Sequence, residues 1–348
     1  MISFKKKLQK QVDIKLPFVV YRKPNEEQII GFFQTNDDLH LVKDFSEMGF
    51  VFCSFDGNQK IIIPDDISEK IVFENLSLEV LLNNNSSNVE NQSSKINFEK
   101  LVEKGILEIN NNQFQKVVLS RTEVVRIDDL DVVNLFLKLI TNYQSAFCYC
   151  FYHPRVGLWL GATPEQLLQI KNDIFKTVSL AGTQKFEGSI DVIWQGKEIE
   201  EQKIVTDFIT NNLKNELENI EISKPFTVQA GNLLHLKTTI SGNTNIDFNL
   251  YKMIKTLHPT PAVCGLPKEI AKKFILENED YNREFYTGFL GELNQDNKTD
   301  LFVNLRCMKI SDNLATLFAG CGITKDSNPV KEYIETVNKI TTMKTILD

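Results

Sequence analysis

The stretch Leu301–Ile310, LFVNLRCMKI, decides how the rest of the sequence is interpreted. Its apolar character is typical of a buried strand, yet it contains a single arginine, Arg306. A second apolar run, Ala315–Ala319, ends on the sequence GCG at residues 320–322. Because an arginine among apolar neighbours needs a carboxylate partner, and a ligand can supply one, we predict an anion-binding site where these two strands lie.

The sequence after this turn predicts a helix with a charged face. Asn328-Pro329 is typical of a helix start, and Glu332, Glu335 and Lys339 follow at i, i+3 and i+7 on one face. The predicted buried face of the same helix consists of the apolar residues Val330, Tyr333, Ile334, Val337 and Ile340. A glycine-flanked turn beside two carboxylates and a lysine suits an anionic ligand together with a divalent cation.

A second helix, predicted over Gly196–Asn219, carries a similar pair of carboxylates. Glu198 and Glu201 are three residues apart and therefore share a face. Two helices that each present such a pair could bind one Mg²⁺, which prefers carboxylates and keeps water molecules that a substrate oxygen can replace. Spacing alone fits solvated glutamates on amphipathic helices better, because such pairs are common on helix surfaces.

Three further residues are candidates for chemistry or binding. Lys116 opens the apolar run Lys116–Arg126, and a lysine that points into a site can serve as a general base. Glu165 lies in a turn between two predicted strands, where a carboxyl group in a dry pocket can act as a general acid. His235 lies in an apolar run, where a histidine is more often a satisfied core residue than a catalyst. A solvated strand-edge lysine and an ordinary turn carboxylate are the non-catalytic explanations of Lys116 and Glu165.

The composition excludes several classes of protein. Of the 348 residues, 42% are hydrophobic and 24% charged, which is ordinary for a soluble globular protein. The net charge of −7 gives no sign of a nucleic-acid footprint, and no apolar run is long enough to predict a membrane span. The lysine-rich N-terminus lacks the apolar segment of a signal peptide. The six cysteines lack zinc-site spacing and predict reduced thiols in a cytoplasmic protein.

Predicted strands outnumber what a regular alternation of strands and helices would give. We therefore predict an α+β fold with large antiparallel β-sheets and helices packed on their outer faces. Residues 1–82 are predicted to form an N-terminal α/β region that is part of the same sheet system. Residues 83–97 are predicted to form an asparagine- and serine-rich loop, and residues 98–348 carry every candidate residue described above.

Nine segments in a fixed order resemble those of the chorismate-utilising enzyme family. They are KVVLSR (116–121), GATPE (161–165), SLAGT (179–183), KEIEEQKIV (197–205), HPTPAVCGLP (258–267), NREFYTGFLGEL (282–293), VNLRCMKI (303–310), AGCGI (319–323) and PVKEYIETVNK (329–339). The order of these segments is more specific than any single motif. The resemblance implies a fold like that of anthranilate synthase component I, with a chorismate-binding catalytic domain over residues 98–348.

Three positions make the chain similar to the isochorismate synthase subgroup. Ala181 stands in SLAGT, where aminodeoxychorismate synthases carry a nucleophilic lysine. Ala262 stands in HPTPA, where amine-forming and salicylate-forming members usually carry threonine, and His258 and Pro261 also fit the subgroup. Gln202 departs from the histidine that many members have after a metal-binding glutamate. Because Gln202 neighbours a ligand and is not one, we expect little effect.

The resemblance also implies roles for individual residues. Lys116 matches the lysine that activates water for attack at C2 of chorismate, and Glu165 matches the acid that protonates the departing 4-hydroxyl. Glu201 and Glu335 match residues that hold Mg²⁺ on the ring carboxylate. The other implied site residues are Glu198 and Glu332 near the metal, Tyr286, Arg306 and Lys339 at the enolpyruvyl carboxylate, Gly182, Thr183, Gly320 and Gly322 where the backbone approaches the substrate, and His235 and Ala262 in the pocket.

The resemblance implies a monomer that uses chorismate and Mg²⁺ and needs no glutamine amidotransferase, nucleic acid or membrane. Isochorismate would feed menaquinone or siderophore biosynthesis, and the sequence favours neither pathway. A salicylate synthase, which goes on to eliminate pyruvate, is the first alternative, and Ala262 argues against it. A non-catalytic chorismate-binding subunit is the second alternative, and the intact Lys116, Glu165 and glutamates argue against it.

Overall fold

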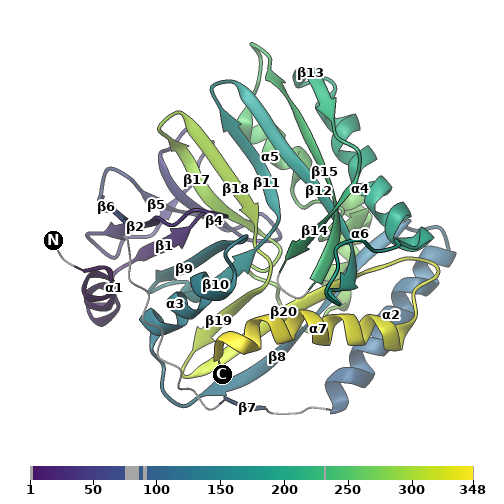
Figure 1. The fold of residues 1–348 in the computed structure, drawn as a ribbon, viewed down its shortest axis with the longest axis horizontal. Helices are drawn as coiled ribbons and strands as arrows, with labels where there is room; N and C mark the ends of the chain where they lie inside the picture. Colours follow the sequence, from purple (N-terminus) through teal and green to yellow (C-terminus); the bar gives the residue numbers. More distant parts are fainter. Residues whose placement is uncertain (1–2, 75–85, 89–91, 231–232, 348) are drawn as a thin grey trace.

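Two ten-stranded antiparallel sheets form the centre of the computed structural model, which describes residues 3–74, 86–88, 92–230 and 233–347 (Figure 1). Sheet A contains β1 (Phe18–Arg22), β2 (Ile29–Gln34), β6 (Ser68–Phe73), β7 (Ser86–Asn88), β8 (Lys116–Ile127), β9 (Phe147–His153), β10 (Gly157–Thr163), β16 (Gly265–Leu266), β19 (Cys307–Ser311) and β20 (Leu314–Ile323). Sheet B contains β3 (His40–Leu41), β4 (Gly49–Cys53), β5 (Lys60–Pro64), β11 (Gln166–Lys171), β12 (Ile174–Lys185), β13 (Leu217–Ile222), β14 (Phe226–Ala230), β15 (Leu233–Thr244), β17 (Phe289–Gln295) and β18 (Lys298–Val303).

Helices cover the outer faces of both sheets. They are α1 (Phe4–Asp13), α2 (Gln92–Asn110), α3 (Val132–Asn142), α4 (Gly196–Leu213), α5 (Leu250–Leu257), α6 (Lys268–Asn278) and α7 (Pro329–Leu347). Helices α1, α3 and α7 share a core with sheet A, whereas α4 and α5 share one with sheet B. This arrangement confirms the predicted α+β fold. No helix in the described ranges is both long and apolar enough to cross a membrane.

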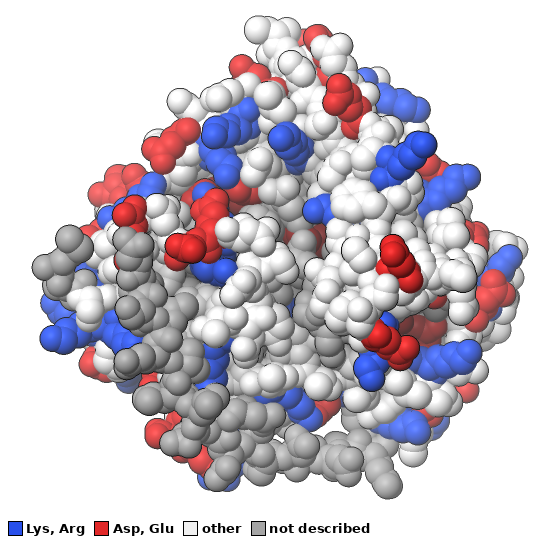
Figure 2. All heavy atoms as spheres, in the orientation of Figure 1, with Lys and Arg blue, Asp and Glu red and all other residues white. Residues whose placement is uncertain are grey.

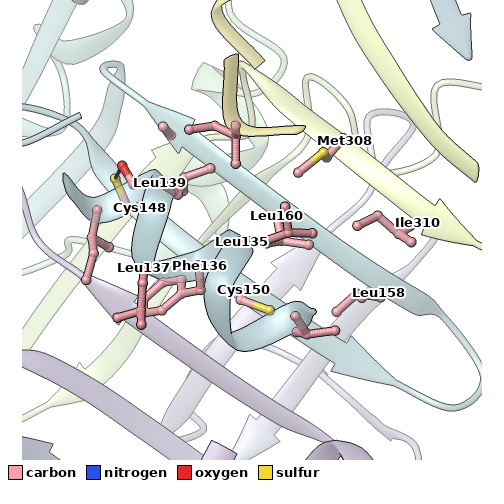
Figure 3. Packing of buried hydrophobic residues seen from close by; sticks show 14 of the residues in the cluster. Leu135, Phe136, Leu137, Leu139, Cys148, Cys150, Leu158, Leu160, Met308 and Ile310 are labelled. Atoms are coloured by element: carbon pink, nitrogen blue, oxygen red, sulfur yellow. Dashed lines mark hydrogen bonds between the residues drawn. The ribbon is translucent and has the colours of Figure 1, made fainter. Parts of the chain in front are cut away.

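Side-chain alternation along each strand separates the cores. In β9, Phe147, Tyr149 and Phe151 point into an aromatic core between the two sheets. Cys148 and Cys150 point the other way, against α3, as Figure 3 shows. The aromatic core fixes one sheet against the other by burying large rings, including Trp159, which is fully buried and stacks on Phe318 with a centroid distance of 5.5 Å.

The predicted single strand Leu301–Ile310 is wrong. It is two strands in different sheets, because β18 ends at Val303 in sheet B and β19 begins at Cys307 in sheet A. Asn304 stabilises the break, since its amide accepts a hydrogen bond from Tyr149 Oη at 2.6 Å and donates one to the Phe285 carbonyl at 2.8 Å. Both halves of the run are mostly apolar because both are buried, so hydrophobicity alone does not distinguish two strands from one.

Strands β10 and β11 change sheet at the same place. β10 ends at Thr163 in sheet A and β11 begins at Gln166 in sheet B, so Glu165 lies at a crossover. The two crossovers are joined, because Val303 N donates to the Glu165 carbonyl at 2.9 Å and Ala162 N donates to the Arg306 carbonyl at 3.0 Å. These two hydrogen bonds place the candidate site residues Glu165 and Arg306 at adjoining crossovers.

Three smaller predictions also need correction. The helix predicted over residues 196–219 ends at Leu213, since Leu217 continues the helical spacing but begins β13. Part of the predicted loop 83–97 lies outside the described residues, and its last residues belong to α2, which begins at Gln92. The prediction missed this start because the polar sequence QSSK lacks the apolar period on which the prediction depended. Val330 and Ile334 are about half exposed, so the predicted buried face of α7 is wrong at these two positions, whereas Ile340 is buried as predicted.

Helix α7 instead turns a mixed polar face inward. Glu332, Thr336, Ile340 and Met343 are its buried residues nearest the start and middle of the helix. Thr336 accepts a hydrogen bond from Arg121 Nε of β8 at 2.7 Å, so a polar contact replaces part of the expected apolar packing. α7 lies across β20 and β8 with α2 beside it (Figure 1). The helix therefore directs its charged face toward residues 320–322. These residues lie inside β20, paired with β8, so the turn predicted there is wrong.

The N-terminal strands belong to both sheets. β1 pairs with β9 in sheet A, and β4 pairs with β17 in sheet B. The strands of residues 18–73 are thus extensions of the sheets that the later sequence builds. All six cysteines are buried thiols within this framework.

Candidate active site

A cavity lies where the two crossovers, β20, α4 and α7 meet. Its volume is about 90 Å³, and it opens to solvent. The predicted site residues that line it are Glu165, Gly182, Thr183, Glu201, His235, Ala262, Tyr286, Arg306, Gly320, Gly322, Glu335 and Lys339. Lys116, Glu198 and Glu332 are not among the lining residues. Segments that lie far apart in the sequence therefore converge on one space.

Lys116 lies directly behind the cavity wall. Its side chain is fully buried, and its Nζ lies 2.8 Å from Glu201 Oε1 on α4. Gly322 allows this approach, because a Cβ at that position would lie 2.5 Å from Glu201 Oε1 and 3.0 Å from Lys116 Cε. The pair joins β8 to α4. Glycine is needed at position 322 because any side chain there would meet both partners.

Replacing Gly322 by alanine should therefore disturb this pair. The added methyl group must displace Glu201, Lys116 or both, and we expect kcat to fall at least roughly tenfold, since small misplacements of reacting groups cost up to about a hundredfold. Steady-state kinetics of the purified variant would measure the loss. Gly196→Ala is the matched control, because a Cβ there meets nothing within 4 Å and should leave kcat unchanged. Equal kinetics for both variants would contradict the assigned geometry.

Glu165 has the environment of a proton donor. The residue is 5% exposed, and burial raises the pKa of its carboxyl group from 4.5 to about 7. The positive charge of Lys116 is the largest influence that lowers this pKa, followed by Thr260 and Lys339. Near neutral pH a substantial fraction of Glu165 is consequently protonated, unlike an ordinary solvated glutamate.

His235 orients an arginine and stays neutral. Its Nδ1 donates to the Gly182 carbonyl at 2.9 Å, and its Nε2 accepts from Arg306 Nη2 at 2.8 Å. Burial, followed by the Arg306 charge, lowers the pKa of His235 to about 3. Burial also lowers the pKa of Arg306 to about 10, so Arg306 remains charged at neutral pH. Arg306 lies in the sheet crossover, where its backbone has a φ of +46°. Its side chain lines the cavity.

Lys339 supplies a second positive charge to the cavity. Its Nζ donates to Glu335 Oε1 at 2.8 Å and to the Gly320 carbonyl at 2.9 Å. Burial alone would lower the pKa of Lys339, but the Glu335 carboxylate more than offsets this effect and the pKa is raised. Basic and acidic side chains are interspersed over the face drawn in Figure 2. Inside the cavity, Arg306 and Lys339 supply positive charge for an anion.

The carboxylates do not form a closed metal cage. Among the residues that the structure describes, no three His, Cys, Asp or Glu side chains gather closely enough to hold a metal ion by themselves. Glu198 Oε2 is nevertheless buried with no hydrogen-bond partner in the described chain, and Glu332 is 2% exposed. A buried carboxylate oxygen without a partner fits a cation site. Mg²⁺ is usually bound by one or two carboxylates and completed by water and substrate, so these residues fit that metal.

Several lining residues were not candidates from the sequence. Thr287 is buried, has a φ of +60° and lines the cavity beside Tyr286. The segment NREFYTGFLGEL contains both residues, but nothing in it marks Thr287 as adopting this conformation. Leu180 and Phe318 supply apolar walls, and Phe318 stacks on Tyr286 at 5.2 Å. Apolar lining residues have no sequence signal that separates them from core residues.

The family model of chorismate binding enzymes matches residues 59–348, which include every cavity residue described above. The chain belongs to this family. This chorismate binding enzyme is 31% identical over 258 residues to the isochorismate synthase EntC of Escherichia coli K12, covering 71% of this chain and 66% of that protein. It is 30% identical to the isochorismate synthase MenF of Bacillus subtilis, covering 70% of this chain and 54% of that protein. The matches thus span less than two thirds of these relatives' length.

Solved structures share the fold of this chorismate binding enzyme. A Bacillus anthracis protein assigned as the 2,3-dihydroxybenzoate-specific isochorismate synthase DhbC superposes with a TM-score of 0.81, at 23% identity and with 98% of this chain and 100% of that chain covered. MenF, the menaquinone-specific isochorismate synthase of Escherichia coli, also gives 0.81, at 20% identity and with 95% and 89% covered. The predicted family and fold are confirmed.

Proposed function

We propose that this protein is an isochorismate synthase, which reversibly converts chorismate to isochorismate by adding water at C2 and releasing the 4-hydroxyl as water. The observation that carries the proposal is a cavity lined by the buried, proton-retaining Glu165, by Arg306 and by Lys339, with the buried Lys116 directly behind its wall. The names of the similar proteins support the same reaction. Ala262 lines the cavity, where a small side chain leaves room for attacking water.

The reaction needs a base and an acid, and we assign these roles to Lys116 behind the cavity wall and to Glu165 in the cavity lining. Lys116 removes a proton from the water that attacks C2, which requires its neutral form. Glu165 gives its proton to the departing 4-hydroxyl, which would otherwise leave as hydroxide. Because the reaction is reversible, the two residues exchange roles in the opposite direction.

The two carboxylates of chorismate require separate positive partners. Arg306 and Lys339, with Tyr286 beside them, bind the enolpyruvyl carboxylate, and His235 holds the Arg306 guanidinium in place. Gly320 brings its backbone to the cavity, and a side chain there would approach the Leu119 carbonyl to 2.8 Å. The ring carboxylate then faces Glu201 and Glu335, whose negative charges would repel it without a cation.

Glu201 and Glu335 hold Mg²⁺ in this proposal, with Glu198 and Glu332 close by. The cation supplies positive charge to the ring carboxylate of the substrate. In the structure Glu201 lies 2.8 Å from Lys116 and Glu335 lies 2.8 Å from Lys339. A cation at these carboxylates would free both lysines for the roles proposed above.

Turnover should therefore depend on Mg²⁺ and on Glu201 in particular. A chelator should abolish activity and added Mg²⁺ should restore it. Glu201→Gln should raise the Mg²⁺ concentration for half-maximal rate by at least roughly tenfold, since one of few anionic ligands is lost. Glu200→Gln is the matched control, because Glu200 is the exposed neighbour on the same helix. Identical Mg²⁺ titrations for the two variants would exclude Glu201 as a ligand.

Product analysis tests the proposed reaction itself. The purified protein would be incubated with chorismate, with and without Mg²⁺, and the products separated by chromatography. Isochorismate in equilibrium with chorismate, formed only with Mg²⁺, is the expected result. Salicylate with pyruvate would identify a salicylate synthase instead, and turnover only with ammonia would identify an amine-forming enzyme. Binding of chorismate without any product would indicate a non-catalytic subunit.

The proposal extends to the enzyme's setting. Isochorismate would enter menaquinone or siderophore biosynthesis, and relatives named for each pathway are among the similar proteins. We infer a cytoplasmic monomer that needs no amidotransferase, because water rather than ammonia is the nucleophile.

A further inference from the structure

A buried arginine outside the cavity connects three of its walls. Arg283 is 2% exposed and lies in the loop between α6 and β17. Its guanidinium donates to the Val118 carbonyl at 2.7 Å, the Val263 carbonyl at 3.0 Å and Thr287 Oγ1 at 3.3 Å. Each of these three acceptor residues lines the cavity, whereas Arg283 itself does not. The guanidinium of Arg283 thus joins β8, the loop between α5 and β16, and the turn before β17.

The three walls carry residues to which the proposed reaction assigns roles. Val118 lies two residues after Lys116, Val263 follows Ala262, and Thr287 follows Tyr286. The backbone of Arg283 adds a further contact, because its carbonyl accepts from Tyr286 N at 2.8 Å. The relative positions of the base, the small pocket residue and the tyrosine therefore depend on the guanidinium.

Glu279 holds the arginine and fixes β8 a second time. Its carboxylate accepts two hydrogen bonds from Arg283, at 2.6 and 2.7 Å, and both side chains are about 1% exposed. It also accepts from Ser120 N at 2.8 Å and Ser120 Oγ at 2.7 Å. The ion pair uses the whole fork of the guanidinium, which a point-like ammonium group cannot reproduce.

We propose that Arg283, oriented by Glu279, is a positioning residue that sets the geometry of Lys116, Ala262 and Tyr286 for the reaction. The proposal rests on the proposed isochorismate synthase function and assigns no substrate contact to Arg283. An arginine with a purely structural role would change the stability of the protein but not the turnover of the folded enzyme. If Arg283 is a positioning residue, its replacement changes both the stability and the turnover. The replacement then also loosens the three cavity walls more than the rest of the sheets.

The test compares Arg283→Lys with a buried ion pair elsewhere. Lysine keeps the charge beside Glu279 but cannot reach all the acceptors, so kcat of the folded variant should fall at least roughly tenfold, as small misplacements of reacting groups do. Glu292→Gln is the matched control, because Glu292 is 4% exposed, accepts from Lys23 Nζ at 2.6 Å and does not line the cavity. It should lower the melting temperature while kcat stays within about twofold of wild type.

Hydrogen–deuterium exchange gives a second readout that needs no activity. In Arg283→Lys, amide exchange should rise in peptides covering residues 117–120, 262–264 and 286–288, and should stay unchanged in β1 and β4. In Glu292→Gln, amide exchange should instead rise in β1 and β4 and stay unchanged in the three peptides of the cavity walls. If Arg283→Lys does not fold, the double variant Arg283→Met with Glu279→Gln removes both charges together and is examined in the same two assays.

The outcomes separate the positioning role from the proposed reaction. Wild-type protein that turns over chorismate, with an Arg283→Lys variant that keeps wild-type kcat and exchange, would overturn the positioning role and leave the proposed function intact. Wild-type protein that never acts on chorismate would overturn the proposed function, and exchange alone would then decide whether Arg283 organises the three walls. Loss of kcat with faster exchange confined to those walls supports the proposal.

Discussion

Replacing Lys116 by methionine should lower kcat by roughly 10²–10⁴-fold, the range that a positioned general base contributes. Lys116 is fully buried, so methionine can fill nearly the same space without the amine. The variant also leaves Glu201 without the cation that lies 2.8 Å from it. Steady-state kinetics in both directions would measure the loss, and chorismate binding should survive because Arg306 and Lys339 remain.

Lys138→Met is the matched control for this experiment. Lys138 is a buried lysine on α3, 4% exposed, and it is not among the residues that line the cavity. Its replacement should leave kcat unchanged, which separates the loss of a base from the loss of any buried lysine. A Lys116→Met enzyme with full turnover, or equal losses in the two variants, would contradict the assignment of the base.

Much of the architecture could be predicted from local patterns, because burial and alternation are properties of short segments. The apolar runs Lys116–Arg126 and Ala315–Ala319 report burial directly, and they lie within the observed β8 and β20. The same property explains the main failure. Hydrophobicity shows that both halves of Leu301–Ile310 are buried, but it cannot show that Asn304 separates two different sheets.

The charged face of α7 shows a second limit of sequence patterns. An amphipathic helix is expected to bury its apolar side, yet Glu332 and Thr336 are buried while Val330 and Ile334 are exposed. One reason is that the surface beneath the first half of α7 is partly polar, with Arg121 reaching Thr336, whereas Ile340 and Met343 farther along pack in the apolar core. A prediction from hydrophobic periodicity assumes that the helix packs on an apolar surface. The prediction therefore fails where the helix packs on charged side chains near a functional site. The order of the nine motifs located the cavity residues because it carries information on tertiary structure that periodicity lacks.

Replacing Glu165 by glutamine should remove the proton donor while keeping its shape. We expect kcat to fall roughly 10²–10⁴-fold, as for loss of a general acid. The pH dependence of the wild type should reflect the same group. The pKa of Glu165 is about 7, so kcat for the forward reaction should fall as pH rises through 7 and the carboxyl group loses its proton. Glu292→Gln should keep both kcat and this pH profile.

The same substitution should change stability with a sign that burial determines. The pKa of Glu165 is raised from 4.5 to about 7 on folding, so the folded protein holds the proton more tightly than the unfolded chain does. Stability from this group is fully present below pH 4.5 and is lost as pH rises through 7, by about 3 kcal/mol. Glutamine has no charge to bury, so Glu165→Gln should gain up to about 3 kcal/mol relative to wild type between pH 4 and pH 8. Denaturant unfolding at the two pH values, without metal, measures the difference. A variant that follows the wild type at both pH values would show that Glu165 is not held in its protonated form, and its role as the acid would fail with it.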